Sequence, residues 1–388
     1  VVGIPNPKHG LSWYANLGGG RFSSRRAIDS SVISGDVDVV VYDLDNDGDL
    51  DLVWTSDNID DMFYAYNVNG SFPARIYGGS AFALFSVDVG DTNNDGVPEL
   101  YYTSSFRDPL RYVILGQTSI AKVHSVEYYI RDTVIGDFNG DGLDDVAILH
   151  STGLIWRRST GSSFATGGTV SFASNRRPAS LSQIHAVDVD SDGDLDLMYG
   201  TGPKASSAPG DSVQIAVNDG NGVFSAFDVG MGVTSSVSVG DFNLDGFPDV
   251  IVQGGITPLV LINPRSNSST DWGAVQPFPL TTWTDPAANA VAVSVADLNA
   301  DSHADIVVAK DDGTALIVHT LETDWYDVTT VVELGLDGQP VLGMALVDVD
   351  ADGDVDVMAA SATTLVALTN SDGQGRVGSP PSILASGL

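Results

Sequence analysis

The sequence predicts an all-β fold, a β-propeller built from four-stranded antiparallel blades. Three observations predict it. A nine-residue acidic motif recurs seven times, both flanks of each copy alternate like β-strands, and the copies begin 46 to 56 residues apart. Four short strands in a repeat of this length are typical of a propeller blade, which must stack on its neighbours to bury its faces. An open β-solenoid is the main alternative that this pattern allows.

The acidic motif first occurs as DLDNDGDLD, starting at Asp43. The other copies are DTNNDGVPE at Asp91, DFNGDGLDD at Asp137, DVDSDGDLD at Asp188, DFNLDGFPD at Asp241, DLNADSHAD at Asp297 and DVDADGDVD at Asp348. Asp-Gly and Asn-Gly clusters are ordinary turn chemistry, and one copy alone fits a plain turn. Seven copies with the same positions filled indicate a repeat array with a shared role.

Each motif lies between two predicted strands. Segments such as VDVVVYD and FSVDVGD precede it, and runs such as LVWTS and LYYTS follow it, all rich in β-branched and aromatic residues. A third strand ends in a Gly/Asn turn and a Phe, as in FYAYNVNGSF and LIWRRSTGSSF. A fourth, weaker strand leads to the next motif.

These units predict a single propeller domain over residues 1–388, with seven repeats in residues 33–388. Residues 1–32 already contain a third and a fourth strand with no motif before them, in GLSWYANLGGGRFSSRRAIDS. They form either a partial blade or the strands that close the ring. Counting third strands gives eight, so eight blade-like units are slightly favoured over seven.

The composition narrows the function classes. The 388 residues include 51 acids and 17 Lys and Arg, for a net charge of −34, which argues against nucleic acid and anionic membranes as partners. There is no cysteine, which excludes disulfides and thiolate chemistry. No apolar run reaches about 18 residues, so no membrane insertion is expected. The first residues lack both a starting Met and a signal-peptide pattern, and we expect a processed or truncated form.

The motif has the spacing of a calcium loop. Calcium takes six to eight oxygen ligands, and positions 1, 3, 5 and 9 offer side-chain oxygens while position 7 offers its carbonyl. Glycine at position 6 permits the positive φ of a sharp turn. Magnesium is the weaker candidate because it needs a strict octahedron, and transition metals favour His or Cys, of which the motifs hold only His303. The seven copies contain 28 of the 51 acids, which fits up to seven bound calcium ions.

The predicted metal ligands follow from this spacing, five per copy. They are Asp43, Asp45, Asp47, Asp49 and Asp51; Asp91, Asn93, Asp95, Val97 and Glu99; Asp137, Asn139, Asp141, Leu143 and Asp145; Asp188, Asp190, Asp192, Asp194 and Asp196; Asp241, Asn243, Asp245, Phe247 and Asp249; Asp297, Asn299, Asp301, His303 and Asp305; and Asp348, Asp350, Asp352, Asp354 and Asp356.

The seven copies are not expected to bind equally. Copies one, four and seven have Asp at position 3, and the other four have Asn, which carries no charge and predicts weaker binding. Copy two ends in Glu99 instead of Asp. Copy six has Ser302 in place of Gly with His303 beside it, and we expect it to be the weakest site or an empty one.

The seven motifs resemble those of the FG-GAP/VCBS repeat family, the calcium-loop propellers of integrin α-subunits and of many secreted microbial and algal proteins. GLSWYANLGGGRF is also similar to a strand and turn common in those repeats. The resemblance covers nearly the whole chain. It implies mainly structural calcium, which fastens the turn between the first two strands of a blade, and an extracellular location, secreted or at the cell surface.

The expected function is a non-catalytic, calcium-stabilised adhesion, scaffold or assembly module that binds an extracellular protein or glycan, alone or within a larger assembly. A calcium-dependent lectin is the first alternative and a polysaccharide lyase or dehydratase the second. The six histidines are scattered and no nucleophile or phosphate-loop motif occurs, which argues against an enzyme.

Two further features bear on glycans. Aromatic side chains could stack on sugars, although packing between blades is the favoured reading; they are Trp13, Tyr14, Trp54, Trp156, Trp272, Trp283 and Trp325. Sequons at Asn69 and Asn267 predict a glycoprotein.

Overall fold

The fold is all-β in a computed structural model of the chain. The structure describes residues 11–17, 22–31, 39–56, 60–80, 84–104, 110–115, 120–124, 130–170, 172, 176–178, 184–203, 212–229, 236–241, 245–253, 259–265, 271–272, 278–279, 290–319, 329–336, 339–350, 352–361, 363–370, 373–375, 377 and 382–386. Within these ranges, seven sheets have four or five strands, and an eighth has two. The predicted fold class is confirmed.

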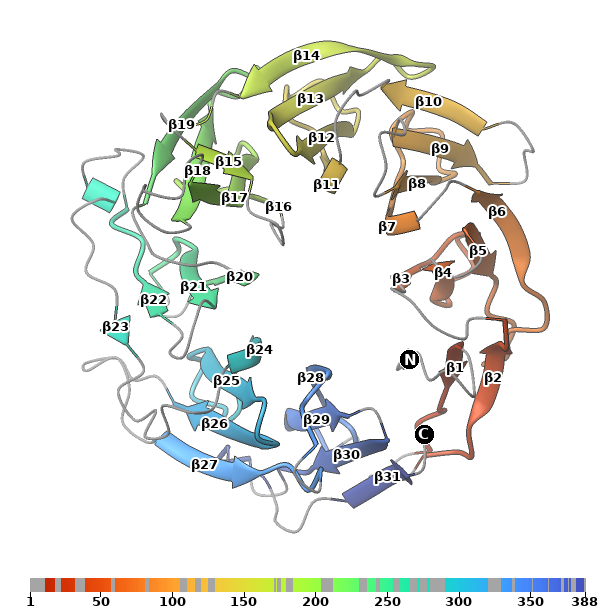
Figure 1. The fold of residues 1–388 in the computed structure, drawn as a ribbon, viewed down its shortest axis with the longest axis vertical. Helices are drawn as coiled ribbons and strands as arrows, with labels where there is room; N and C mark the ends of the chain where they lie inside the picture. Colours follow the sequence, from red (N-terminus) through yellow and green to blue (C-terminus); the bar gives the residue numbers. More distant parts are fainter. Residues whose placement is uncertain are drawn as a thin grey trace. The chain divides into compact units, whose positions relative to one another are not determined.

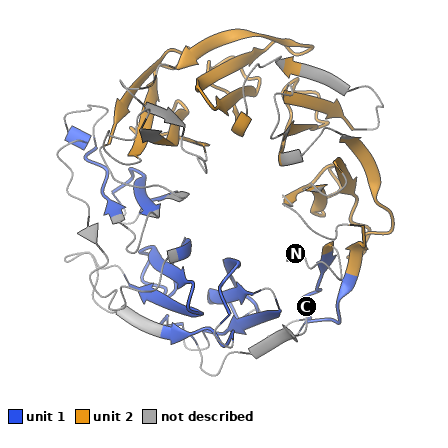
Figure 2. Cartoon of the chain, in the orientation of Figure 1, with its two compact units in different colours: residues 1–8, 12–26, 235–388 blue, residues 9–11, 27–234 orange. Residues whose placement is uncertain are grey.

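Contacts divide the chain into two compact units, coloured separately in Figure 2. Unit 1 holds residues 1–8, 12–26 and 235–388, and unit 2 holds residues 9–11 and 27–234. Each unit is built from sheets in which consecutive strands pair side by side.

Unit 2 contains four of the larger sheets (Figure 1). The first is β3 (Val39–Tyr42), β4 (Asp51–Ser56), β5 (Asp61–Ala65) and β6 (Ile76–Ser80). The second is β7 (Leu84–Gly90), β8 (Glu99–Ser104), β9 (Leu110–Ile114) and β10 (Ile120–His124). The third is β11 (Ile130–Gly136), β12 (Asp145–His150), β13 (Gly153–Ser159) and β14 (Phe164–Val170).

The fourth sheet of unit 2 departs from the four-strand pattern. Its strands are β15 (Arg176–Pro178), β16 (Ile184–Val187), β17 (Asp196–Pro203), β18 (Ser212–Asn218) and β19 (Phe224–Asp228). The long β17 pairs with β16 at its start and with β15 at its end. The innermost position of this sheet is therefore shared by two short strands.

Unit 1 contains three four-stranded sheets (Figure 1). They are β20 (Ser236–Gly240), β21 (Asp249–Gln253), β22 (Leu259–Leu261) and β23 (Phe278–Pro279); β24 (Ala290–Ala296), β25 (Asp305–Lys310), β26 (Thr314–Val318) and β27 (Thr329–Glu333); and β28 (Gly343–Val347), β29 (Asp356–Ala360), β30 (Thr364–Leu368) and β31 (Ser382–Ser386).

The two N-terminal strands predicted without a motif are present. They are β1 (Leu11–Trp13) and β2 (Arg26–Asp29), which form the two-stranded sheet. In unit 1, Tyr14 packs in a core cluster with residues of β29 and β30, and Phe22 lies against that cluster.

The cores lie between successive sheets inside each unit. In unit 2, Leu44 and Val53 cluster with Val87 and Leu100 from the next sheet. In unit 1, Val307 and its neighbours cluster in the same way with Val357 of the following sheet. Because each sheet buries its face against the next one, the acidic motifs are held at fixed turns between the first and second strands.

The part of the chain that the structure describes contains no helix of the length and apolar character that a membrane span requires.

Candidate metal-binding loops

All seven motifs form the same tight loop, which joins the first strand of a sheet to the second. We number them loop 1 (residues 43–51), loop 2 (91–99), loop 3 (137–145), loop 4 (188–196), loop 5 (241–249), loop 6 (297–305) and loop 7 (348–356). Residues 242–244 of loop 5, including the predicted ligand Asn243, and residue 351 of loop 7 lie outside the described residues.

Position 1 closes each loop. Its carboxylate accepts the backbone N–H of position 5 at 3.1–3.3 Å and that of position 6 at 2.8–3.0 Å in every copy. Position 6 has positive φ in all seven, including Ser302 with φ 73°. Loop 6 therefore keeps the common shape although Ser302 bears the strain that glycine avoids.

Position 5 supports the next turn. Its carboxylate accepts the N–H of position 7 at 2.8–3.0 Å in each loop, for example from Asp49 to Asp47. These repeated side-chain bonds to the backbone are the chemistry for which Asp is selected in turns. Turn formation thus accounts for the aspartates at positions 1 and 5.

Position 9 is a buried carboxylate in every loop. Its exposure is 0 % for the six aspartates, such as Asp51, and 1 % for Glu99. One oxygen accepts the N–H of position 2, at 2.8 Å from Leu44 to Asp51. In loops 1, 3, 4, 5 and 7 the other oxygen accepts an N–H from the end of the third strand, at 2.6–2.7 Å. Position 9 therefore joins the loop to the third strand of its own sheet.

Positions 1, 3 and 9 converge in three of the loops. Oxygen atoms of Asp43, Asp45 and Asp51 lie within 4.8 Å of one another, and the same holds in loops 4 and 7 for Asp188, Asp190 and Asp196 and for Asp348, Asp350 and Asp356. These are the three copies with Asp at position 3, and we call them the Asp-type loops. Position 5 is not part of any of the three trios.

Burial, and after it repulsion between carboxylates, raises the pKa of two acids in the trios. Burial, followed by the charges of Asp356 and Asp352, raises the pKa of Asp350. Burial, partly offset by backbone hydrogen bonds and reinforced by the charges of Asp190 and Asp192, raises the pKa of Asp196 to about 7. A cation among the three carboxylates would relieve this repulsion.

Loops 2 and 3 have Asn at position 3, and we call them the Asn-type loops. Asn93 Nδ2 donates to Glu99 Oε1 at 2.7 Å, and Asn139 Nδ2 donates to Asp145 Oδ2 at 2.6 Å. The amide therefore supplies position 9 with a hydrogen-bond donor from within the loop, where the Asp-type loops place a third negative charge.

Loops 5 and 6 have basic groups beside their carboxylates. Arg265 Nε donates to Asp245 Oδ2 at 2.8 Å in loop 5. In loop 6, His303 Nδ1 lies 3.2 Å from Asp301 Oδ1, and His319 Nδ1 lies 3.1 Å from Asp305 Oδ2. The hydrogen bond to Asp305, opposed by burial, raises the pKa of His319. These contacts add to the expectation that loop 6 binds metal weakly.

The donor set fits a hard cation. Asp350 Oδ1 in loop 7 and Asn93 Oδ1 in loop 2 are buried oxygens with no hydrogen-bond partner among the described residues. Both belong to position 3, the predicted ligand that is Asp in some loops and Asn in others. Unpaired buried oxygens of this kind are explained by an ion that they would bind. The assignment of five ligands to each loop stays a prediction.

A second feature of the loops was not foreseen from the sequence. The carbonyl of position 2 accepts a side-chain donor from the end of a third strand in the following sheet. The bonds are Ser159 Oγ to Thr92 at 2.5 Å, Asn218 Nδ2 to Phe138 at 2.9 Å, Asn370 Nδ2 to Leu298 at 2.5 Å and Asn16 Nδ2 to Val349 at 2.8 Å. Asn16 thus occupies the place of Asn370, although β1 follows no motif. The signal in the sequence was the Asn that precedes the glycine-rich turn.

The aromatic residues considered for sugar stacking mostly pack inside the units. Trp54, Trp156, Trp272 and Tyr14 are buried. Trp13 is half-buried, with the Arg26 guanidinium 4.9 Å from its ring centre. Packing, the favoured reading, holds for the four buried residues; Trp283 and Trp325 lie outside the described residues, as does the sequon residue Asn267. The other sequon residue, Asn69, is exposed in the turn between β5 and β6.

Comparison with known proteins addresses the family. The profile of the FG-GAP-like repeat matches residues 1–54, 43–102 and 137–199. A search of curated protein sequences finds no matching relative.

Several solved structures share the fold at low sequence identity. An Agrocybe aegerita lectin that recognises non-reducing terminal N-acetylglucosamine has a TM-score of 0.54 and 17% identity, over 91% of this chain and 90% of the lectin. The BP39L lectin from Burkholderia pseudomallei has a TM-score of 0.51 and 13% identity, over 90% and 99%. The Dos1 propeller has a TM-score of 0.55 and 11% identity, over 91% and 84%.

At these identities the structural matches speak for the fold alone. Together with the sheets and loops of this chain, they confirm the resemblance drawn from the motifs: the fold is that of a β-propeller, and residues 1–102 and 137–199 are similar to FG-GAP-like repeats.

Proposed function

We propose that this protein is a non-catalytic binding module whose Asp-type loops hold calcium and whose partner is an extracellular glycan or protein. The observation that carries the proposal is the convergence of three carboxylates within 4.8 Å in loops 1, 4 and 7. Oxygen-only sites of this kind suit calcium better than zinc or copper, which favour nitrogen and sulfur ligands.

The exposure of the loops supports an extracellular location. Asp45 and Asp47 are exposed and Asp43 is half-buried, so three of the predicted ligands of loop 1 remain in contact with water. We expect such an open site to bind calcium weakly, in the range of about 10⁻⁴–10⁻³ M that extracellular modules use. The calcium level outside cells would fill such sites, and the level of the cytosol would leave them empty.

Calcium would act here on stability. Position 9 joins each Asp-type loop to a third strand, so an ion that fixes positions 1, 3 and 9 would fix the connection between three strands of a sheet. Ions that bind only the folded state stabilise it by mass action. The fold neighbours that are lectins support a glycan as the partner, whereas the scattered histidines of this chain give no support to a catalytic role.

Thermal unfolding in the presence of metals tests the calcium claim. At about ten times the dissociation constant, each site contributes about 1.4 kcal/mol, and three sites contribute about 4 kcal/mol. We expect EDTA to lower the Tm by roughly 5 °C, calcium to restore it, and magnesium at the same concentration to restore much less. An identical melting curve with and without EDTA would refute the calcium role.

A further inference from the structure

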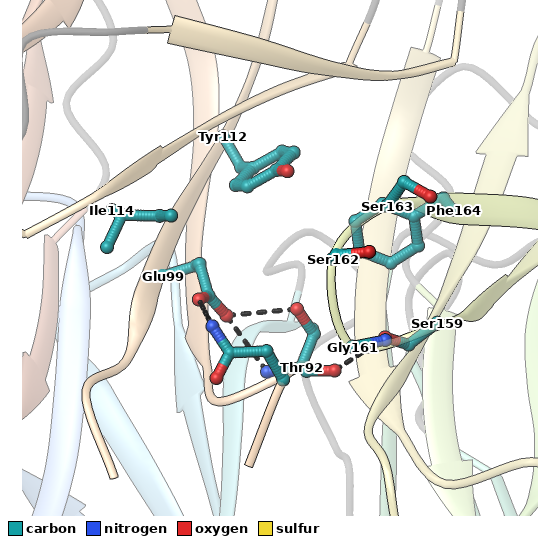
Figure 3. Close-up of a pocket in the computed structure, with 10 residues that line it drawn as sticks. Thr92, Glu99, Tyr112, Ile114, Ser159, Gly161, Ser162, Ser163 and Phe164 are labelled. Atoms are coloured by element: carbon teal, nitrogen blue, oxygen red, sulfur yellow. Dashed lines mark hydrogen bonds between the residues drawn. The ribbon is translucent and has the colours of Figure 1, made fainter. Parts of the chain in front are cut away.

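A pocket lies between the sheets β7–β10 and β11–β14 of unit 2, beside loop 2 (Figure 3). Its volume is about 40 Å³, and its mouth is open to solvent. Tyr112 and Phe164 form apolar walls, Thr92 and Glu99 form the floor, and Ser162 and Ser163 stand on the exposed rim. A cavity of this volume holds about three water-sized groups, so it suits one edge or one substituent of a sugar ring that lies across the open mouth.

The next space between sheets, between β11–β14 and β15–β19, is equivalent to this pocket, but aromatic side chains fill it. We call it the filled gap. Phe138 at position 2 of loop 3 is 0 % exposed and Trp156 is 3 % exposed. Their ring centres are 6.4 Å apart, and both lie 6.0–6.4 Å from Phe224. Trp156 Nε1 also donates to the carbonyl of Gly222 at 3.1 Å.

The strand register shows that the two gaps are built from corresponding residues. Tyr112 pairs with Tyr101 in β8, and Trp156 pairs with Ala147 in β12. Tyr101 and Ala147 each lie two residues after position 9 of their loop. Tyr112 therefore takes the place of Trp156.

The other members of the two gaps correspond through the turns of the third strands. Phe164 and Phe224 are the first residues of β14 and β19, and Ser162 and Gly222 each lie two residues before them. Thr92 takes the place of Phe138, since both are at position 2. The pocket arises because Thr92 and Tyr112 are smaller than Phe138 and Trp156.

The floor of the pocket is held rigid by hydrogen bonds. Thr92 Oγ1 donates to Glu99 Oε2 at 2.9 Å and lies 2.7 Å from the Tyr101 hydroxyl (Figure 3 draws the bond to Glu99). Tyr112 stacks on Tyr101 with 5.6 Å between ring centres, and it meets Phe164 edge to face at 5.7 Å. A cleft that persists between rigid walls is ready to receive a ligand without reorganisation.

The lining selects a neutral and hydroxyl-rich ligand. Aromatic walls suit the C–H faces of a sugar ring, and the rim serines supply hydroxyl groups that donate and accept hydrogen bonds. Glu99 beneath them repels acidic sugars and phosphates, and the described lining contains no Lys, Arg or His to attract them.

We propose that this pocket binds a single neutral pyranose unit. The proposal rests on the proposed binding function and assigns it a place on the molecule. The pocket is distinct from the Asp-type loops, but Asn93 and Glu99, two predicted ligands of loop 2, belong to its lining. Sugar binding there would use the space between two sheets.

Filling the pocket tests this assignment. Methyl glycosides of glucose, galactose, mannose and N-acetylglucosamine are titrated against the full chain by saturation-transfer NMR, in calcium buffer. The wild type is expected to bind at least one of them. Thr92→Phe places in the pocket the residue of the filled gap, and we expect it to weaken binding at least tenfold.

Thr92→Val is the matched control. It removes the same hydroxyl as Thr92→Phe but keeps the pocket open, so we expect Thr92→Phe to bind the sugar at least threefold more weakly than Thr92→Val. If Thr92→Phe does not fold, the triple variant Thr92→Phe, Tyr112→Trp and Ser162→Gly is used in its place, because it reproduces the residues of the filled gap.

The possible results test the pocket assignment separately from the proposed function. Sugar binding that Thr92→Phe leaves unchanged would overturn the pocket assignment and leave the binding function standing. Absence of binding to all four glycosides would also overturn it, and the calcium response of the melting curve would remain as the test of the proposed function. Binding of lysine methyl ester in place of the sugars, abolished by Thr92→Phe, would replace the neutral sugar with a cationic ligand.

Discussion

Loop 4 and loop 3 have the same backbone and differ in how their buried acid is satisfied. In loop 4, Asp196 lies within 4.8 Å of two other carboxylates, Asp188 and Asp190. In loop 3, Asp145 accepts a hydrogen bond of 2.6 Å from Asn139. Both loops share the position 1 and position 9 bonds to the backbone. One side chain at position 3 therefore decides whether the loop needs an ion.

This difference separates two roles of the aspartates. The bonds to backbone N–H groups shape all seven loops and need no metal. The third carboxylate of the Asp-type loops adds a repulsion that a bound cation would relieve. Loops 1, 4 and 7 are therefore the proposed calcium sites, and the hydrogen bonds of the Asn-type loops leave them at most a weaker site.

Among the changes that test this comparison, Asn139→Asp is expected to alter the free energy of unfolding most. It replaces the donor to Asp145 with a second carboxylate, which leaves a buried charge uncompensated at a cost of about 3 kcal/mol in EDTA. Calcium is expected to recover most of that loss, because loop 3 then has the acids of an Asp-type loop. Denaturant unfolding with and without calcium measures both quantities, and a loss that calcium does not reduce would break the comparison.

Asp190→Asn is the reverse change and should have a smaller effect. Its amide can donate to Asp196 as Asn139 does to Asp145, so the ion-free protein is expected to gain about 1 kcal/mol of unfolding free energy. The stabilisation by calcium should shrink by about one site. A variant that is less stable than wild type in EDTA would contradict the claim that the acids of loop 4 repel one another.

The pH dependence of stability in EDTA tests the same buried acids. The pKa of Asp145 is raised to about 6 and that of Asp196 to about 7, in both cases chiefly by burial, from an ordinary value of 3.8. Between pH 4 and 7 the folded protein then binds more protons than the unfolded chain, so its stability rises as the pH falls from 8 to 5.

Saturating calcium should reverse that slope, since a bound ion favours the ionised carboxylates and is released on acidification. Urea unfolding at several pH values, with and without calcium, checks the two signs. The same slope in both conditions would show that the buried acids do not take part in metal binding.

The fold was largely predictable from the sequence, and the reason is periodicity. The predicted strand in VDVVVYD contains β3, and FSVDVGD corresponds to β7, because β-branched residues in alternation favour an extended strand with one face toward a core. The predicted N-terminal pair is present as β1 and β2. The split inner strand of the β15–β19 sheet was not predicted, since no change of composition marks it.

The candidate sites were predictable only in part. The spacing predicted the loops, and the Asp or Asn at position 3 predicted which of them gather three carboxylates. The role of position 9 as a link to the third strand was hidden, because its partner is a backbone N–H of a residue such as Asn218, 22 positions away. The pocket beside Thr92 was hidden as well, since it depends on the absence of bulk between two sheets.

A count of bound calcium ions tests the central claim most directly. Equilibrium dialysis with calcium, followed by elemental analysis, is compared for the wild type and the variant Asp45→Asn, Asp190→Asn and Asp350→Asn. We expect three tightly bound calcium ions per wild-type chain and the loss of these three ions in the variant. The Tm of the variant in EDTA should be no lower than that of the wild type. Equal numbers of ions in the two proteins would contradict the central claim.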